Sequence, residues 1–358
     1  MNLISKRCLS VILACVMVQC PLKVLAQDEP VYQETYVIKS NSLLPEYYQP
    51  TVLVLPDSTL ACAWATGSGP LALDNAINIA FKRVDGMQWT LPVVVADEEG
   101  YPDNYPVLSM LPDGGLRLFF STRYREKRRV FPGEDQAAWQ LMYKDSEDAG
   151  RIWGKEYFLI SESDRIPCSR IVSLSNGDLL LPATNVRDRS SVLLKSNDRG
   201  NYWRYYTTAK ELSGLVDPVI VELAAGHLLG LLRPYEKGER EKVLWRIESR
   251  DYGETWTKPQ SAELKNAGSP IALLKLANGH LLLAYNDYES WLMPLTVAIS
   301  TDGGESWQNN RKIESGRWGR DPSLVQTDDG HIHLIYVSRN IYLKHIEFNE
   351  SWLLNQKE

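Results

Sequence analysis

Cysteine is scarce in this chain. It occurs five times in 358 residues, and Cys8, Cys15 and Cys20 all lie within the first 20. Only Cys62 and Cys168 remain, and they fall in different sequence repeats. Two such cysteines cannot build a disulfide framework. We therefore expect two free thiols, even in an oxidising compartment.

Histidine is equally scarce. His227, His280 and His331 follow turn residues, while His333 and His345 lie within expected strands. No His or Cys residues have the spacing of a zinc site, and no glycine-rich phosphate loop or calcium-loop spacing occurs. A Ser–His or zinc mechanism therefore has no support, and we expect no metal and no cofactor.

Long hydrophobic runs are missing after the N-terminus, so no membrane span is expected. Lys6 and Arg7 precede an apolar run over residues 8–18, and Val24-Leu25-Ala26 fits a cleavage site. We interpret residues 1–26 as a signal peptide and expect a secreted or periplasmic protein. Residues 12–15 (Ile-Leu-Ala-Cys) form a loose lipobox, which makes a lipid anchor the second alternative.

Basic residues are outnumbered by acidic ones, with a formal net charge of −6. Cleavage after Ala26 removes Lys6, Arg7 and Lys23 and no acidic residue, which changes the charge to −9. An acidic protein binds polyanions poorly, so nucleic acid is excluded as a partner. An anionic ligand would need a local cluster of arginines.

Helical periodicity and low complexity are also absent, whereas one octet, S-x-D-x-G-x-x-W, recurs. It spans residues 146–153, 196–203, 249–256 and 300–307. Its aspartates, Asp148, Asp198, Asp251 and Asp302, are 50, 53 and 51 residues apart, a period typical of propellers. The Asp can accept backbone N–H groups, the Gly accepts positive φ, and the Trp anchors the turn. We therefore interpret the octets as structural turns.

These octets resemble the Asp boxes of the bacterial neuraminidase repeat, found in sialidases and their relatives. The resemblance implies a six-bladed β-propeller, an all-β fold, over nearly the whole mature chain. A degraded copy occupies residues 85–89 (Asp-Gly-Met-Gln-Trp).

A second repeat gives the number of blades. Six apolar runs end in a tight turn; they begin at Pro50, Pro106, Ser169, Pro218, Pro270 and Pro322. A further apolar run follows each turn, so each unit begins as a hairpin with both faces covered. We predict one domain over residues 27–358, with six four-stranded blades and the boxes at the end opposite the site. The run 31–40 should complete the sixth sheet and protect its edge.

The resemblance places a site where the inner strands begin, so the residues before each run should converge. They mix aromatic side chains, arginines and carboxylates, a set suited to gripping an acidic sugar. The candidate binding residues are Tyr48, Gln49, Asn104, Tyr105, Arg165, Arg233, Asn286, Trp291, Trp318 and Arg320.

Compared with sialidases, the segment from Asp217 to Arg233 is similar to the one that carries a catalytic Glu and a substrate arginine, with Asp217 where Glu is usual. The chain departs from the family elsewhere. Tyr48-Gln49-Pro50 stands in place of Arg-Ile-Pro, Trp291 to Pro294 lacks the third arginine, and Arg320-Asp321 occupies the place of the nucleophilic Tyr.

Asp217 and Asp321 each precede the Pro that opens an inner strand, so the repeat places them at equivalent height around the axis. Two such carboxylates could serve as acid and as base or nucleophile in glycoside hydrolysis. Alternatively, they neutralise Arg233 and Arg320, which are otherwise expected to bind a carboxylate or sulfate. Asp103 and Asp287 are the reserve carboxylates.

Three functions follow. The first is a secreted exo-acting glycoside hydrolase on a terminal, acidic sugar of a glycan or polysaccharide. The second is a polysaccharide lyase acting on uronic acids, and the third is a glycan-binding propeller without catalysis. We expect a monomer whose partner is the glycan.

Overall fold

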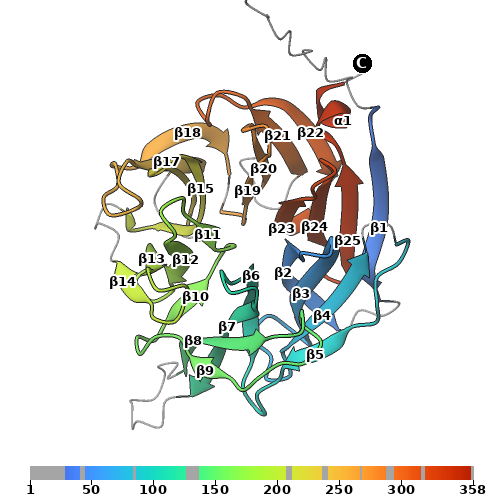
Figure 1. The fold of residues 1–358 in the computed structure, drawn as a ribbon, viewed down its shortest axis with the longest axis vertical. Coiled ribbons are helices and arrows are strands. Elements are labelled where there is room, and N and C mark those ends of the chain that lie inside the picture. Colours follow the sequence, from blue (N-terminus) through green and yellow to red (C-terminus); the bar gives the residue numbers. More distant parts are fainter. Residues whose placement is uncertain are drawn as a thin grey trace, which may run out of the picture.

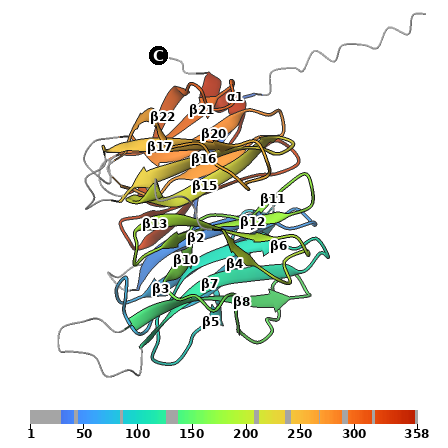
Figure 2. The same cartoon turned by 90° about the vertical axis from the view of Figure 1, so that its left-hand side faces the viewer.

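The computed structural model describes residues 29–40, 45–83, 86–125, 137–206, 212–235, 241–266, 268–287, 294–315 and 319–355. The proposed signal peptide, Trp291 and Trp318 lie outside this part of the chain. The described residues form six sheets arranged in a ring, as the sequence predicted (Figure 1). Seen from the side, the strands run roughly along the ring axis (Figure 2).

The sheets are six blades of antiparallel strands, and the strands of each blade follow one another from the axis outward. Blade one is β2 (Glu46–Val54), β3 (Thr59–Gly67), β4 (Ala76–Arg83) and β5 (Val93–Ala96). Blade two is β6 (Asp103–Met110), β7 (Leu116–Arg125), β8 (Ala137–Ser146) and β9 (Tyr157–Phe158). Blade three is β10 (Arg165–Pro167) with β11 (Val172–Ser173), then β12 (Leu179–Asn185), β13 (Ser190–Ser196) and β14 (Arg204–Tyr206).

The second half of the ring follows the same plan. Blade four is β15 (Leu215–Ala224), β16 (His227–Pro234), β17 (Val243–Ser249) and β18 (Gln260–Lys265). Blade five is β19 (Ala272–Lys275), β20 (Leu281–Asn286), β21 (Leu295–Ser300) and β22 (Gln308–Glu314). Blade six is β23 (Gly319–Gln326), β24 (Ile332–Ser338), β25 (Tyr342–Phe348) and β1 (Tyr32–Lys39), and the helix α1 (Glu350–Leu354) follows it.

The N-terminal strand closes the ring, as the sequence predicted. β1 pairs with β25 from Tyr32↔Phe348 to Lys39↔Tyr342. The Tyr32 ring stacks on Trp352 of α1 with centroids 4.6 Å apart. The last blade thus takes its outer strand from the other end of the chain, and this strand covers the edge of β25.

The inner strand of blade three differs from the other five. It is divided into β10 and β11, so this sheet contains five strands rather than four. Between the pairs Pro167↔Ala183 and Val172↔Leu180, the inner chain advances five residues while β12 advances three. The run that lacks its opening proline, at Ser169, is therefore the one that does not form a continuous strand.

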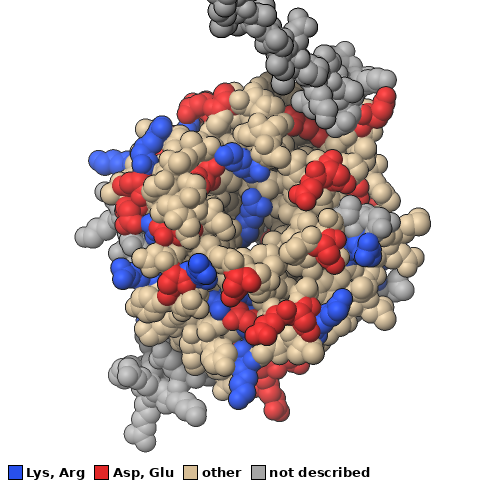
Figure 3. Space-filling model, in the orientation of Figure 1, with Lys and Arg blue, Asp and Glu red and all other residues tan. Residues whose placement is uncertain are grey.

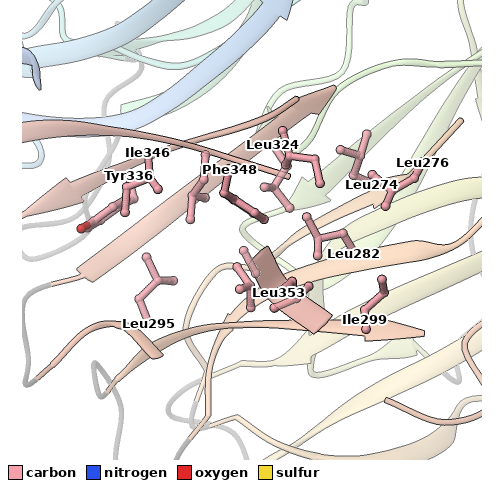
Figure 4. Packing of buried hydrophobic residues seen from close by; sticks show 14 residues of the cluster. Leu274, Leu276, Leu282, Leu295, Ile299, Leu324, Tyr336, Ile346, Phe348 and Leu353 are labelled. Atoms are coloured by element: carbon pink, nitrogen blue, oxygen red, sulfur yellow. The ribbon is translucent and has the colours of Figure 1, made fainter. Parts of the chain in front are cut away.

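Buried clusters lie between neighbouring blades, which explains the near-continuous apolar runs. The cluster between blades five and six includes Leu282, Leu324 and Phe348, and Leu353 of α1 packs into it (Figure 4). Similar clusters occupy the interfaces of the other blade pairs. Both faces of each sheet are thus covered, as expected for blades stacked around an axis.

The four Asp boxes form near-identical turns between the third and fourth strands of blades two to five. In the box of blade five, Ser300 donates to Asp302 at 2.7 Å, and the N–H of Ser306 donates to Asp302 at 2.9 Å. The box of blade four meets the hairpin turn of its own sheet, since the N–H of Tyr252 donates to the carbonyl of Gly226 at 3.1 Å. The boxes therefore lie at the end of the ring opposite the starts of the inner strands.

An Asp302→Ala variant should unfold with a free energy about 1 kcal/mol lower than the natural protein, the usual cost of losing a side-chain cap. Hydrogen bonds from Ser306 and Ser300 lower the pKa of Asp302 to about 2. Urea unfolding at pH 7 measures the change. An Asp328→Ala variant, in an exposed turn at the same end, is the control and should show no loss.

Candidate active site

The site begins with bulges in four inner strands. In blades one, two, four and six, the residue before the opening proline has positive φ: Gln49 (47°), Tyr105 (60°), Asp217 (51°) and Asp321 (53°). Each ladder contains one extra residue at this point. A non-glycine residue before proline adopts this conformation only under strain, and bulges of this kind re-aim side chains near active sites.

The re-aimed side chains face a common space on the ring axis, which we call the central cavity. It has a volume of about 240 Å³, and Gln49, Tyr105, Asp217 and Asp321 all line it. Its walls also include Cys168, Ser169, Arg170 and Arg233. Figure 3 shows the ring hollowed at its centre, with atoms of basic side chains inside the hollow. The structure thus brings the proposed carboxylate pair to one cavity.

Asp217 is held from two sides. Arg233 donates through Nε at 2.7 Å and lies 2.6 Å away through Nη2, and the Thr184 hydroxyl donates to the other carboxylate oxygen at 2.8 Å. Arg233 also donates to the carbonyl of Gly268 at 2.6 Å, which ties blade four to blade five. Asp217 and Arg233 thus form the ion pair that the sequence left open as an alternative.

Asp321 has a similar environment in blade six. Arg320 donates to it at 2.5 Å and also bonds to Asn340 and to the carbonyl of Tyr47. The N–H of Gln49 donates to Asp321 at 3.3 Å, and the Gln49 side-chain carbonyl accepts the N–H of Tyr105 at 3.2 Å. Three bulges are therefore linked by hydrogen bonds across blades.

The Tyr105 hydroxyl and the Cys168 thiol are two neutral proton-bearing groups that line the cavity. Burial raises the pKa of the Tyr105 phenol, and the negative charge of Asp217 adds to the effect. Burial also raises the pKa of the Cys168 thiol, which lies 3.1 Å from the Thr184 hydroxyl. Both groups stay neutral at ordinary pH and can act as hydrogen-bond donors.

Several predicted binding residues lie elsewhere. Asn104 and Asn286 are buried, and they bond to Asn75 and to the carbonyl of Gly319, so neither lines the cavity. Tyr48 packs beneath the Arg320 guanidinium, 5.1 Å from ring centroid to Cζ. Arg165 donates to the carbonyl of Ser163 at 2.8 Å and is likewise absent from the cavity wall. Repeat position alone could not separate side chains that turn inward from those that brace loops.

The reserve carboxylate Asp103 is fully buried and does not line the cavity. Burial raises its pKa to about 7, although hydrogen bonds from Thr122 and from the N–H of Glu98 oppose the change. Asp103 is thus a group that gains a proton near neutral pH, away from the proposed pair.

Arg170 is the cavity residue that sequence reasoning missed. It follows Ser169, so it occupies the repeat position of Thr51, Val107, Val219, Ile271 and Ser323, all of which also line the cavity. None of those five is charged. When the six repeats are aligned, Arg170 is the single basic residue at a position that is otherwise small or apolar. This difference could have identified Arg170 from the sequence.

Neither a metal-binding cluster nor a membrane-spanning helix is found in the described part of the chain. It contains no group of three or more His, Cys, Asp or Glu side chains that could hold a metal ion. None of its helices has the length and apolar character needed to cross a membrane.

Residues 58–334 match the family model described as "BNR repeat-like domain", which covers more than half of the chain. The chain therefore belongs to this family of sialidase-like propellers. A comparison with curated proteins finds no match.

Solved structures with this fold include glycoside hydrolases. The intramolecular trans-sialidase from Ruminococcus gnavus is 16% identical with a TM-score of 0.71, covering 90% of this chain and 98% of that one. The Penicillium chrysogenum α-L-arabinanase is 17% identical with a TM-score of 0.65, covering 90% and 99%. A protein of unknown function from Dyadobacter fermentans is 16% identical with a TM-score of 0.72, covering 89% and 99%. At such identities the likeness shows the fold alone.

Proposed function

We propose that the protein is a secreted or periplasmic exo-acting glycoside hydrolase that removes a terminal, acidic sugar from a glycan or polysaccharide. The observation that carries the proposal is the pair of strained bulges that aims Asp217 and Asp321 into one cavity. Paired carboxylates are the working groups of most glycoside hydrolases. The sialidases and the arabinanase of the same fold are consistent with this class of reaction.

The size of the cavity supports exo action. Its volume of about 240 Å³ is below the roughly 300–1,000 Å³ of most ligand pockets, so it suits one sugar unit rather than a run of chain. The arginines in and beside it favour a sugar that carries a carboxylate or sulfate.

One observation favours a second function, glycan binding without turnover. Asp217 is paired with Arg233 and Asp321 with Arg320. Each carboxylate thus already has a guanidinium as its partner, and such an ion pair can be purely structural. Hydrolysis therefore requires the substrate to displace at least one of these ion pairs.

A screen of the purified protein against defined glycans tests the proposal. The panel should pair each acidic terminus, such as a sialoside or a glucuronide, with its neutral counterpart. New reducing ends on the acidic members are the expected result. Ultraviolet absorbance from an unsaturated product would instead indicate a lyase, and retention on a glycan column without product would indicate a binding protein.

A further inference from the structure

Arg170 is the one charged residue of the central cavity whose charge is left uncompensated within the described part of the chain. The cavity's other guanidinium, on Arg233, is paired with Asp217, and Asp321 is paired with Arg320, which does not itself line the cavity. No described side chain or backbone group forms a hydrogen bond or an ion pair with Arg170. Desolvation by the surrounding protein lowers the pKa of its guanidinium, although the side chain is still partly exposed.

The position of Arg170 gives access to two spaces. It lines the central cavity and also a second cavity of about 220 Å³, formed with Ser173, Ile220, Glu222 and Lys275. The other charged groups of the second cavity, on Lys275 and Glu222, have partners. Lys275 donates to the carbonyls of Glu222 and Leu223, and the Glu222 carboxylate accepts hydrogen bonds from Ser175 and Gly226.

The break in the inner strand explains how an arginine fits there. Residues 168–171 lie between β10 and β11 and are not part of either strand. The equivalent residues of the other blades, such as Val107 and Val219, are small or apolar. Packing of the ring therefore does not require a guanidinium at this position.

The Arg170 side chain is partly exposed, lines the central cavity and has no partner among the described residues, so its guanidinium can bind an anion that enters the cavity. We propose that Arg170 makes the floor of the central cavity an anion site for a carboxylate or sulfate group. The planar guanidinium offers paired donors that match either oxyanion. The two ion pairs, Arg233–Asp217 and Arg320–Asp321, are each neutral. The net charge of the group is therefore the single positive charge of Arg170, which a monovalent anion neutralises.

The anion can be free or carried by the sugar. The sugar-borne source rests on the proposed function, because it makes Arg170 the residue that selects an acidic terminus. The anion site itself does not depend on that function, so the two are tested separately.

Calorimetric titration with sodium sulfate and with sodium acetate, in a low-chloride buffer, tests the site. The natural protein should bind, and an Arg170→Met variant should bind at least roughly tenfold more weakly, the loss expected for a hydrogen bond to a charged group. Arg187→Met is the matched control, because it removes the same charge from an exposed ion pair with Asp164. Equal binding by the natural protein and Arg170→Met would overturn the proposal.

Thermal unfolding measures the same binding by a second method, because an anion that binds only the folded protein raises its melting temperature. Without added anion, Arg170→Met should melt close to the temperature of the natural protein, because Arg170 is partly exposed and forms no hydrogen bond or ion pair that would be lost. Millimolar sulfate should raise the melting temperature of the natural protein and of Arg187→Met but not that of Arg170→Met. If Arg170→Met fails to fold, Arg170→Lys replaces it and should bind sulfate more weakly, since it loses the paired donors. A sulfate response that is identical in all variants would contradict the site.

Glucuronate and glucose, which differ in one carboxylate, identify the source of the anion. Preference for glucuronate in the natural protein and its loss in Arg170→Met would place the sugar's acid group on Arg170. If sulfate and acetate bind while glucuronate is no better than glucose, the anion site stands and the sugar-borne source is wrong.

Discussion

A variant in which Asn replaces Asp217 is expected to turn over its glycan substrate roughly 10²- to 10⁴-fold more slowly than the natural protein, the usual contribution of a catalytic acid or base. Asn tolerates the positive φ of 51° at this position, and its side-chain carbonyl can still accept the Thr184 hydroxyl. The charge, the titratable group and the ion pair with Arg233 are lost. Turnover on a glycan found by the screen, measured beside circular dichroism, checks the effect.

Asp321→Asn should give a loss of similar size, since Asp321 lies at the equivalent bulge of blade six. Asp328→Asn, at the opposite end of that blade, is the matched control and should leave turnover unchanged. Near-normal turnover in both Asp217→Asn and Asp321→Asn, with the fold intact, would remove the pair from the mechanism and favour glycan binding alone.

The second prediction with a large expected effect concerns how the stability of the fold depends on pH. It involves two buried histidines of blade six, which lie next to the N-terminal strand β1. His333 Nδ1 and His345 Nε2 are 3.0 Å apart, and the rings stack with centroids 5.2 Å apart. Thr327 contacts His333, and Thr35 of β1 contacts His345. The pair therefore connects the closing strand to the interior of the sheet.

Burial lowers the pKa of His333 to about 4, and burial together with the charge of His333 lowers the pKa of His345. The groups that face the pair act in both directions. Glu347 and Asp329 favour the protonated form, whereas Lys82 and His331 oppose it, and Trp89 of blade one packs against His345.

Unfolding releases both rings to water, where a histidine titrates near 6.5. Between pH 6.5 and 4 the unfolded chain thus binds more protons than the folded one, so the stabilisation from neutral histidines is present above pH 6.5 and lost as the pH falls towards 4. The shift of His333 alone corresponds to a loss on the order of 3 kcal/mol. Urea unfolding at pH 7 and pH 4.5 should show it.

Asp103 has the opposite effect on stability. Its pKa is raised to about 7 in the folded protein, so the folded state takes up this proton first and becomes more stable as the pH falls through 7. The prediction therefore compares the loss of stability on acidification between the natural protein and its variants, all of which keep Asp103. A His333→Leu/His345→Leu variant should lose less stability between pH 7 and pH 4.5 than the natural protein. His280→Gln, whose ring is partly exposed beside Glu350, is the control. An identical loss in all three proteins would show that the pair does not set the acid sensitivity.

Much of the fold was predictable because propeller blades repeat a local pattern. Each Asp box bonds mainly within itself, as Ser300 and Ser306 do with Asp302, so its residues specify the turn wherever it lies in the ring. The alternation of apolar runs and turns gave the six hairpins for the same reason. The break at Ser169 coincided with the missing proline, since that run lacks the residue that opens the inner strand in the other blades.

The site was predictable only in part. The repeat placed Asp217 and Asp321 at equivalent heights, and both do line the cavity. It could not distinguish Tyr105, which turns into the cavity, from Asn104 beside it, which is buried among loop residues. Adjacent residues on a strand point to opposite faces, and the bulge shifts that alternation by one residue.

By itself the sequence determined the class of fold, the number of blades, the closing role of the N-terminal strand and the ring of residues from which a site could be built. These features depend on local patterns and on repetition. Only the tertiary structure decided which arginines have partners. Arg233 and Arg320 meet carboxylates across short distances, while Arg170 meets none in the described chain. Each ion pair lies within one blade, and the sequence offered them only as an alternative to a free carboxylate pair. The choice depends on how side chains are oriented at a bulge and on how they approach within a few ångströms, which the order of the residues does not specify.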